Sequence, residues 1–388
     1  MEENKPPIKQ SIDVRFVAST LLFLAVAAGL SLHCYHSILG IDALGYAGTV
    51  ALADTDDVVK VHQIVYSAPL TPHLRGLDGD TPQALDMRRR AADPYLAAMH
   101  FPYFAIKPLY VLTLQATHKL GFSVIDSVRA TSALFYFGIA VMLWVYTRSW
   151  VAVMVMILPE SMILGQTHDP DGMSCFLMLL GLWMVFFKRR DIGLLPLLLA
   201  IWVRPENALL CVLVCLALVL QGRLDWPKAA VLFLLSAGSV LLISHYGSPW
   251  KEVYGHFLGA APGTGAVSAF SNYRFSLAKA VNDSLHSAVP LFVLLWFVCF
   301  PFVQDELRWI MGITLVFSAV RFVMVPGYEA RYFGLFFITT SIAGVALIQK
   351  GLYRDLARKT IHDLRELTSS RFRKSKLPEA ALPASRAD

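Results

Sequence analysis

Long apolar runs follow one another along the chain and are separated by short polar breaks. A helix needs roughly 20 apolar residues to cross a bilayer, so each long run predicts a membrane-spanning helix. The predicted spans are 16–37, 103–119, 127–147, 172–187, 192–204, 206–220, 229–245, 287–303, 308–325 and 332–349. The pattern therefore predicts an all-α polytopic membrane protein with about ten transmembrane helices.

Clusters of Lys and Arg indicate how the spans are oriented, because cytoplasmic loops are rich in these residues. Such clusters lie at 188–190, at 223–228 and in the tail 351–388. All of them fall on one side if the short apolar segment 150–165 enters the membrane and returns. We therefore predict one re-entrant segment, both termini in the cytoplasm, and a basic cytoplasmic tail after a membrane domain over 1–350.

This topology places five polar segments on the outer face. The first outer loop, 38–102, is long and is predicted to contain helix. The five segments are 38–102, 167–172, 203–207, 246–286 and 326–332. The inner loops are short, so we expect the chemistry to take place on the outer face.

The composition supports a membrane protein and argues against other classes. The 388 residues are 56% hydrophobic and 16% charged, with a mean hydropathy of +0.55 and a net charge of +6. A soluble domain has about 25% charged residues, so a soluble enzyme, a nucleic-acid binder and a disordered protein are all poor fits. The five cysteines form neither a disulfide framework nor a zinc motif.

Asp42 directly follows the first span, with Tyr46 four residues later. It has two interpretations. An acid at the start of a short loop helix is favoured by the helix dipole. An acid at the membrane face can also serve as a general base.

The segment GQTHDPDGM carries His168, Asp169 and Asp171. Two carboxylates in a rigid turn can bind a hard cation such as Mg²⁺ or Mn²⁺, or act as a base. Asp, Pro and Gly are also common turn residues, so a simple linker between two helices is the alternative.

Two arginines lie at outer helix ends, Arg204 in VRPEN and Arg331 in PGYEARY. The planar guanidinium group can hold a phosphate by two hydrogen bonds. The alternative is a local ion pair, such as Arg204 with Glu206, or contact with lipid headgroups. Lys107, at the start of the second predicted span, can face the same cavity.

The order and spacing of these motifs resemble the GT-C superfamily of membrane glycosyltransferases over about 16–350. Asp42 with Tyr46 resembles the catalytic aspartate of the first outer loop in that family. FAIKPLYVLTLQ and FSVIDSVRATSALFY resemble its second and third helices, and the THDPDG segment lies where relatives carry a D-x-D motif. LLLAIWVRPEN resembles its arginine-proline break, HYGSPW its Y-G-x-P motif, and PGYEARYF its late R-Y motif.

The resemblance implies an inverting transfer of a sugar from a polyprenyl-phosphate donor to a cell-envelope glycan or glycolipid, on the periplasmic face of the inner (plasma) membrane. Asp42 would be the base, Asp169 and Asp171 would orient the acceptor, and these three are the possible ligands of a Mg²⁺ or Mn²⁺ ion. The residues implied in donor phosphate binding are Arg204, Arg331 and Lys107. Those implied in other substrate contacts are Tyr46, His168, Tyr246, Tyr328 and Glu329.

Two features depart from the family pattern. The chain lacks the large C-terminal outer domain of oligosaccharyltransferases, and its first loop lacks the D-E pair of protein mannosyltransferases. A compact bacterial-type enzyme is therefore expected, in contact with membrane lipids and with no nucleic acid as partner. The alternatives are a transporter or flippase of lipid-linked sugar and a non-catalytic membrane scaffold.

Overall fold

The computed structural model describes residues 14–37, 39–66, 82–245, 266–326 and 329–351, and these residues contain helices and no strand. The first helices are α1 (Val14–Tyr35), α2 (Ile41–Ala51), α3 (Val58–Tyr66), α4 (Pro82–Ala92), α5 (Pro94–Ala98), η1 (Phe101–Phe104), α6 (Pro108–Lys119), α7 (Val124–Thr147), α8 (Val151–Ile157), α9 (Pro159–Gln166) and α10 (Asp171–Leu182). The later ones are η2 (Trp183–Phe187), η3 (Asp191–Gly193), α11 (Leu194–Val203), η4 (Pro205–Asn207), α12 (Ala208–Leu220), α13 (Trp226–Ile243), α15 (Ala266–Leu285), α16 (Val289–Cys299), α17 (Asp305–Met324), η5 (Ala330–Phe333) and α18 (Gly334–Gln349). Tyr246, Tyr328 and the tail from 352 lie outside the described residues.

Several of these helices are apolar and long enough to cross a membrane. Five qualify singly: Val14–Tyr35, Val124–Thr147, Trp226–Ile243, Asp305–Met324 and Ala330–Gln349. Two bent pairs raise the number to seven if each pair is one span, and Asp191–Val203 and Pro205–Leu220 are shorter apolar helices. The described chain is thus an all-helical protein with five to seven candidate spans, consistent with a multi-pass membrane protein.

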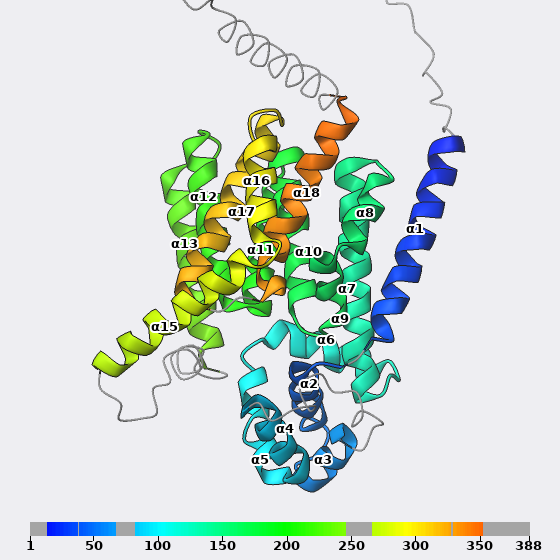
Figure 1. Ribbon diagram of the computed structural model, residues 1–388, viewed down its shortest axis with the longest axis vertical. Coiled ribbons are helices and arrows are strands. Elements are labelled where there is room, and N and C mark those ends of the chain that lie inside the picture. Colours follow the sequence, from blue (N-terminus) through cyan, green and yellow to red (C-terminus); the bar gives the residue numbers. More distant parts are fainter. Residues whose placement is uncertain (1–13, 38, 67–81, 246–265, 327–328, 352–388) are drawn as a thin grey trace, which may run out of the picture.

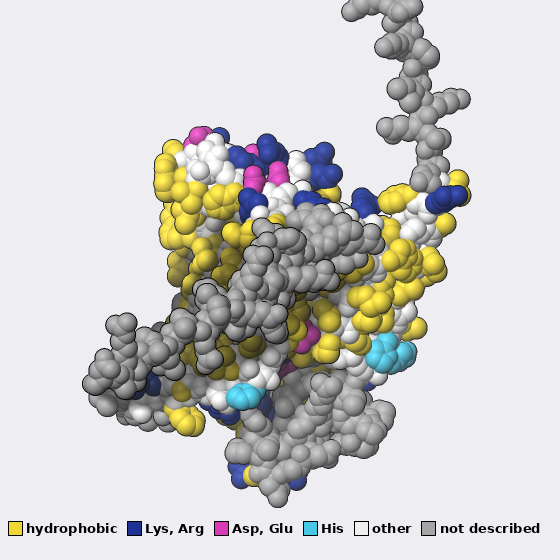
Figure 2. Space-filling view, turned by 45° about the horizontal axis from the view of Figure 1, so that its top comes forward, with side chains coloured by type: hydrophobic (Ala, Val, Ile, Leu, Met, Phe, Trp, Pro, Cys, Tyr) yellow, Lys and Arg dark blue, Asp and Glu magenta, His cyan; other side chains and the backbone are white. Residues whose placement is uncertain are grey.

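The helices form a bundle with a cap of short helices at one end (Figure 1). α1 begins and α18 ends at the opposite end of the bundle from the cap, which is built by α2 to α5. Hydrophobic side chains cover the sides of the bundle, whereas Lys, Arg, Asp and Glu gather at the end opposite the cap (Figure 2). An apolar side between two polar ends is the surface that a bilayer requires.

Segment 150–165 was predicted to be re-entrant, and in the structure it lies along α1 as two short helices. Trp150 Nε1 donates to Ser19 Oγ at 2.7 Å near the start of α1, and His168 Nε2 lies 3.2 Å from the Cys34 carbonyl oxygen at the end of α1. The segment therefore extends over almost the whole length of α1. Its helix is broken before Pro159, because the residue preceding a proline is pushed out of helical geometry.

The span predicted over 103–119 is not among the candidate spans of the described residues. Tyr110 and Thr117, seven residues apart on α6, lie 3.5 and 3.3 Å from the adjacent residues Ser132 and Thr131 of α7, so α6 runs across α7 and not along it. With 12 residues α6 is about 18 Å long. Four of its residues are buried by protein, whereas Leu112 is 59% exposed.

These two observations act together on the predicted sidedness. If 103–119 does not cross and 150–166 does, every basic cluster stays on the same side of the bundle. The common sidedness therefore holds when both assignments change and is lost when only one of them changes.

The cap contacts the bundle through α2, which packs closely on η1. A Cβ atom added to Gly45 would lie 2.0 Å from Phe104, and one added to Gly48 would lie 2.3 Å from Phe101. The buried ring of Tyr46 packs edge-on against Phe104 and Tyr110. The small glycine side of α2 thereby fixes the position of Asp42, in the first turn of this helix.

Candidate functional site

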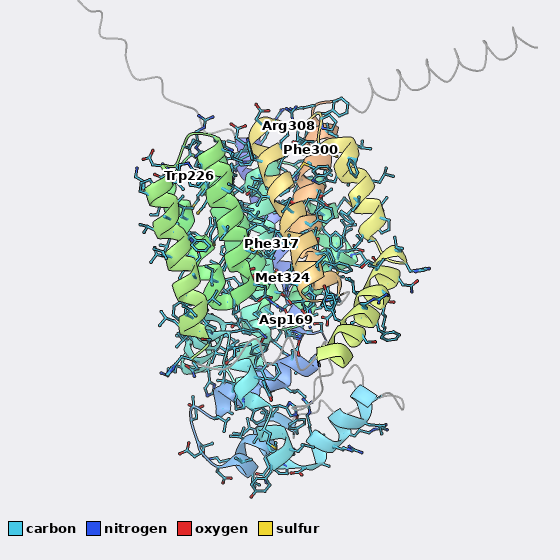
Figure 3. All side chains as sticks on the ribbon, turned by 90° about the vertical axis from the view of Figure 1, so that its left-hand side faces the viewer. Asp169, Trp226, Phe300, Arg308, Phe317 and Met324 are labelled. Atoms are coloured by element: carbon cyan, nitrogen blue, oxygen red, sulfur yellow. The ribbon has the colours of Figure 1, made fainter. Side chains whose placement is uncertain are left out.

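Four segments that are distant in sequence meet at the cap end of the bundle. They are the start of α2, the turn 167–170 before α10, the break 204–207 between α11 and α12, and the residues at the start of α18. Asp169 lies at the end of the bundle opposite Trp226 and Arg308 (Figure 3). The sequence placed these segments on one face, and the structure brings their charged side chains into contact.

Arg331 lies among four carboxylates. Its Nη1 atom donates to Asp42 Oδ2 at 2.8 Å and also to Asp169 Oδ2. Its Nε atom donates to Glu329 and lies 3.6 Å from Asp171 Oδ2. Asp42, Asp169, Asp171 and Arg331 thus belong to one cluster, as the predicted active site requires.

Arg204 is buried and is held from two sides. Its Nε and Nη2 atoms lie 2.5 and 2.8 Å from the two oxygens of Asp171, and Nη1 donates to Glu206 Oε1 at 2.7 Å. The side chains of Arg204 and Asp171 are only 10% and 4% exposed. The Arg204–Glu206 pair, left open by the sequence, is therefore present, together with a two-point contact to Asp171.

A third arginine, Arg321 in the last turn of α17, completes the cluster and was missed by the sequence reasoning. Its Nη2 atom donates to Glu206 Oε1 at 3.0 Å, and its Nη1 atom donates to the Tyr332 carbonyl oxygen at 3.0 Å. The sequence did contain a signal for it, namely an arginine within an apolar helix. Such an arginine almost always faces a partner or a water-filled cavity.

All three guanidinium groups lie against the ring of Tyr332. The distances from their carbon atoms to the ring centroid are 5.3 Å for Arg204, 4.5 Å for Arg321 and 5.3 Å for Arg331. A cation over an aromatic face is attracted by the ring's electron density. Tyr332 thus contacts every arginine of the cluster.

His168 shapes the turn that carries Asp169. Its backbone is left-handed, with φ of 53°, and its Nε2 atom lies 3.2 Å from the Cys34 carbonyl oxygen. That oxygen can only accept, so Nε2 carries the proton. Burial, followed by the charge of Arg129, lowers the pKa of His168 to about 4. His168 is therefore neutral at pH 7 and ties the turn to α1; its predicted contact with substrate stays a prediction.

Asp169 is fully buried but remains ionised. Burial alone would raise the pKa of its carboxyl group, but the charges of Arg331 and Arg204 outweigh burial and leave the pKa below its usual value. Its Oδ1 atom also accepts the backbone N–H of Asp171 at 2.9 Å.

Lys107 and Tyr46 lie beside this cluster, at the junction with the cap. The Nζ atom of Lys107 is 5.2 Å from the ring centroid of Tyr46 and 5.8 Å from that of Phe104. Burial, followed by the charge of Asp42, raises the pKa of the Tyr46 phenol. Lys107 is thus placed next to the cluster, on the side of α2 that carries Asp42.

The predicted Mg²⁺ or Mn²⁺ site at Asp42, Asp169 and Asp171 does not fit the observed arrangement. In the part of the chain that the structure describes, no three His, Cys, Asp or Glu side chains are placed to share a metal ion. The three predicted ligands are each in contact with a guanidinium group.

The arrangement combines a half-exposed carboxylate with buried cations at the end of a membrane bundle. Such a site can take a proton at Asp42 and bind an anion at an arginine. Comparisons with protein-family models, with curated proteins and with solved structures gave no match to this chain. Its function is therefore inferred from the geometry of this cluster.

Proposed function

We propose that this protein is a membrane glycosyltransferase that moves a sugar from a polyprenyl-phosphate donor to a glycan or glycolipid acceptor of the cell envelope. The observation that carries the proposal is the contact of Arg331 with both Asp42 and Asp169. These three residues come from three distant segments, and each segment resembles a GT-C motif. Contact among three such residues supports the proposal more strongly than contact between one base candidate and one phosphate-binding candidate would.

In the proposed reaction the acceptor hydroxyl attacks the anomeric carbon of the donor sugar. Asp42 takes the hydroxyl proton, a new C–O bond forms, and the bond between the anomeric carbon and the phosphate oxygen breaks with inversion. Asp42 suits this role because its carboxylate is 40% exposed, so an acceptor can reach it.

The leaving group is the polyprenyl phosphate, on which negative charge builds as the bond breaks. A fixed guanidinium group stabilises this charge better than water does, because it needs no reorganisation. Arg331 is the cation in contact with the base candidate. Asp169 and Asp171 hold the arginines in place, and Lys107 and Tyr46 border the site from the cap.

The membrane setting belongs to the same proposal. With 150–166 as a crossing and α6 outside the membrane, the chain would have ten spans in a GT-C-like arrangement. Its basic clusters would lie in the cytoplasm and the cap in the periplasm, at the inner membrane. The lipid tail of the donor would lie among the helices while its phosphate reaches the charged cluster.

A transfer assay tests this function directly. The purified protein in lipid nanodiscs is given a polyprenyl-phosphate sugar and an envelope extract, and labelled sugar on the acceptor is measured. We expect transfer by the wild type and loss of transfer in Asp42→Asn. Lipid movement without transfer, unaffected by Asp42→Asn, would favour a flippase; neither activity would favour a scaffold.

A further inference from the structure

The four carboxylates around Arg331 fall into two kinds. Asp169 and Asp171, the inner pair, are 1% and 4% exposed. Asp42 and Glu329, the outer pair, are 40% and 48% exposed. Arg331 itself is 13% exposed, so it lies at the boundary between a buried network and the outer surface.

The charges of the buried network balance without the outer pair. Its three cations are Arg204, Arg321 and Arg331, and its three anions are Asp169, Asp171 and Glu206. The two outer carboxylates are therefore in excess. A site with excess negative charge does not bind a phosphate unless some of this charge moves away.

The two pairs differ in how easily they leave Arg331. A buried carboxylate that loses its partner stays desolvated, which is costly. A half-exposed carboxylate returns to water, so the loss of its partner costs far less. An incoming anion can therefore replace Asp42 and Glu329 far more readily than Asp169 or Asp171.

The carboxylates that contact Arg204 cannot be replaced by a phosphate in the same way. Its Nε and Nη2 atoms contact Asp171 and its Nη1 atom contacts Glu206, while Tyr332 covers its face. A phosphate at Arg204 would have to displace a carboxylate that is almost fully buried. The two arginines that the sequence assigned equally to phosphate binding thus have different environments.

We propose that the phosphate of the lipid-linked donor binds Arg331 by replacing the outer pair, and that this exchange releases Asp42 to act as the base. The inference rests on the proposed function and adds an order to it: the donor binds before Asp42 can accept the acceptor's proton. Arg331 remains anchored by Asp169 during the exchange, and Arg204 keeps its place in the buried network.

Competition between Asp42 and the ligand gives a direct test. The probe is a polyprenyl phosphate without sugar, and its Kd is measured for the full-length protein in nanodiscs. Asp42→Asn should strengthen binding about tenfold, which corresponds to about 1.4 kcal/mol, although the same substitution abolishes transfer. Glu329→Gln should strengthen binding in the same direction.

Two controls separate competition from a general charge effect. Asp56→Asn removes one exposed carboxylate of the cap and should change Kd less than twofold. In an Arg331→Gln background, Asp42→Asn should not strengthen the binding of polyprenyl phosphate, since the guanidinium group for which Asp42 and the phosphate compete is absent. If Arg331→Gln fails to fold, the Kd values of Asp42→Asn and Asp56→Asn still distinguish competition from a general charge effect.

The source of the recognised phosphate is also tested. Uncharged polyprenol should bind at least tenfold more weakly than polyprenyl phosphate, and inorganic phosphate should compete with the latter weakly. An unchanged or weaker affinity in Asp42→Asn overturns the exchange while leaving the glycosyltransferase proposal standing. No binding of polyprenyl phosphate by the wild type overturns both.

Discussion

The carboxylate of Asp42 accepts a hydrogen bond at 2.8 Å from the guanidinium group of Arg331, across 289 positions of the chain. Asp42 belongs to the cap and Arg331 to the start of the last helix of the bundle. The pair therefore exists only when cap and bundle are correctly docked. The proposed chemistry at Asp42 therefore depends on the correct folding of the cap.

Asp42→Asn is expected to lower transfer by at least a hundredfold, because a positioned base contributes about 10² to 10⁴ to the rate. The folded state should survive, since the lost carboxylate is half-exposed. Initial rates of sugar transfer and the melting temperature are measured together. Asp56→Asn is the matched control, and equal rates for both variants would contradict Asp42 as the base.

Arg204→Gln is expected to lower the free energy of unfolding by about 3 kcal/mol or more, because it removes the two-point contact with the buried carboxylate of Asp171. Arg189→Gln, which breaks the exposed pair with Glu306, should cost less than about 1 kcal/mol. Thermal unfolding in detergent compares the two. Similar losses in both variants would argue against a special structural role of Arg204.

Gly45→Ala is expected to destabilise the docking of the cap by about 1–3 kcal/mol, because the new methyl group would overlap the ring of Phe104. Gly29→Ala in α1 is the control, since nothing lies within 4 Å of its added Cβ atom. Limited proteolysis of the cap and the melting temperature report the effect. Adding Phe104→Ala to Gly45→Ala should restore part of the lost stability.

Stability is expected to fall as the pH is lowered from about 6.5 to about 4. His168 has an unfolded pKa near 6.5 and a folded pKa of about 4, so over this window the unfolded chain takes up the proton more readily. The full difference amounts to about 3 kcal/mol. His168→Asn tolerates the left-handed backbone and should flatten the pH dependence of the melting temperature. A wild-type profile that is already flat would contradict this.

Removal of divalent cations with a chelator is expected to change the transfer rate by less than about twofold. The physical reason is that Asp42, Asp169 and Asp171 are each paired with an arginine. The rate is measured before and after chelation and again after Mg²⁺ or Mn²⁺ is restored. A loss that the added cation reverses would show that these carboxylates bind metal during the reaction.

The sequence predicted the candidate site better than it predicted the path of the chain. Asp42, THDPDG, VRPEN and EARY stood out because each places a charge beside an apolar helix, where an unpaired charge is costly. Which charges pair was not readable, since the contacts join residues up to 289 positions apart. Arg321 was passed over because it lies inside a predicted span, 308–325, and not in a loop.

Segments 103–119 and 150–165 show why hydropathy alone is insufficient. Several apolar residues of α6 are buried against other helices, and a hydropathy pattern does not distinguish protein from lipid as the apolar surrounding. The common sidedness of the basic clusters was the reason to predict a return of segment 150–165. The structure instead continues past the break at Pro159, because α9 packs beside α1 and α18.

The ring of Tyr332 fixes the register of the whole cation cluster. Three guanidinium groups contact this single side chain. Their arrangement around the ring therefore depends on where Tyr332 lies relative to the start of α18. One residue inserted just before Gly334 would rotate Arg331 and Tyr332 by about 100° around the helix axis relative to the rest of α18. Such an insertion would move Arg331 and Tyr332 away from Arg204 and Arg321, which Asp171 and Glu206 hold, while leaving the apolar exterior intact. A chain that still inserts into lipid would have lost the contacts of Arg331 with Asp42 and Asp169.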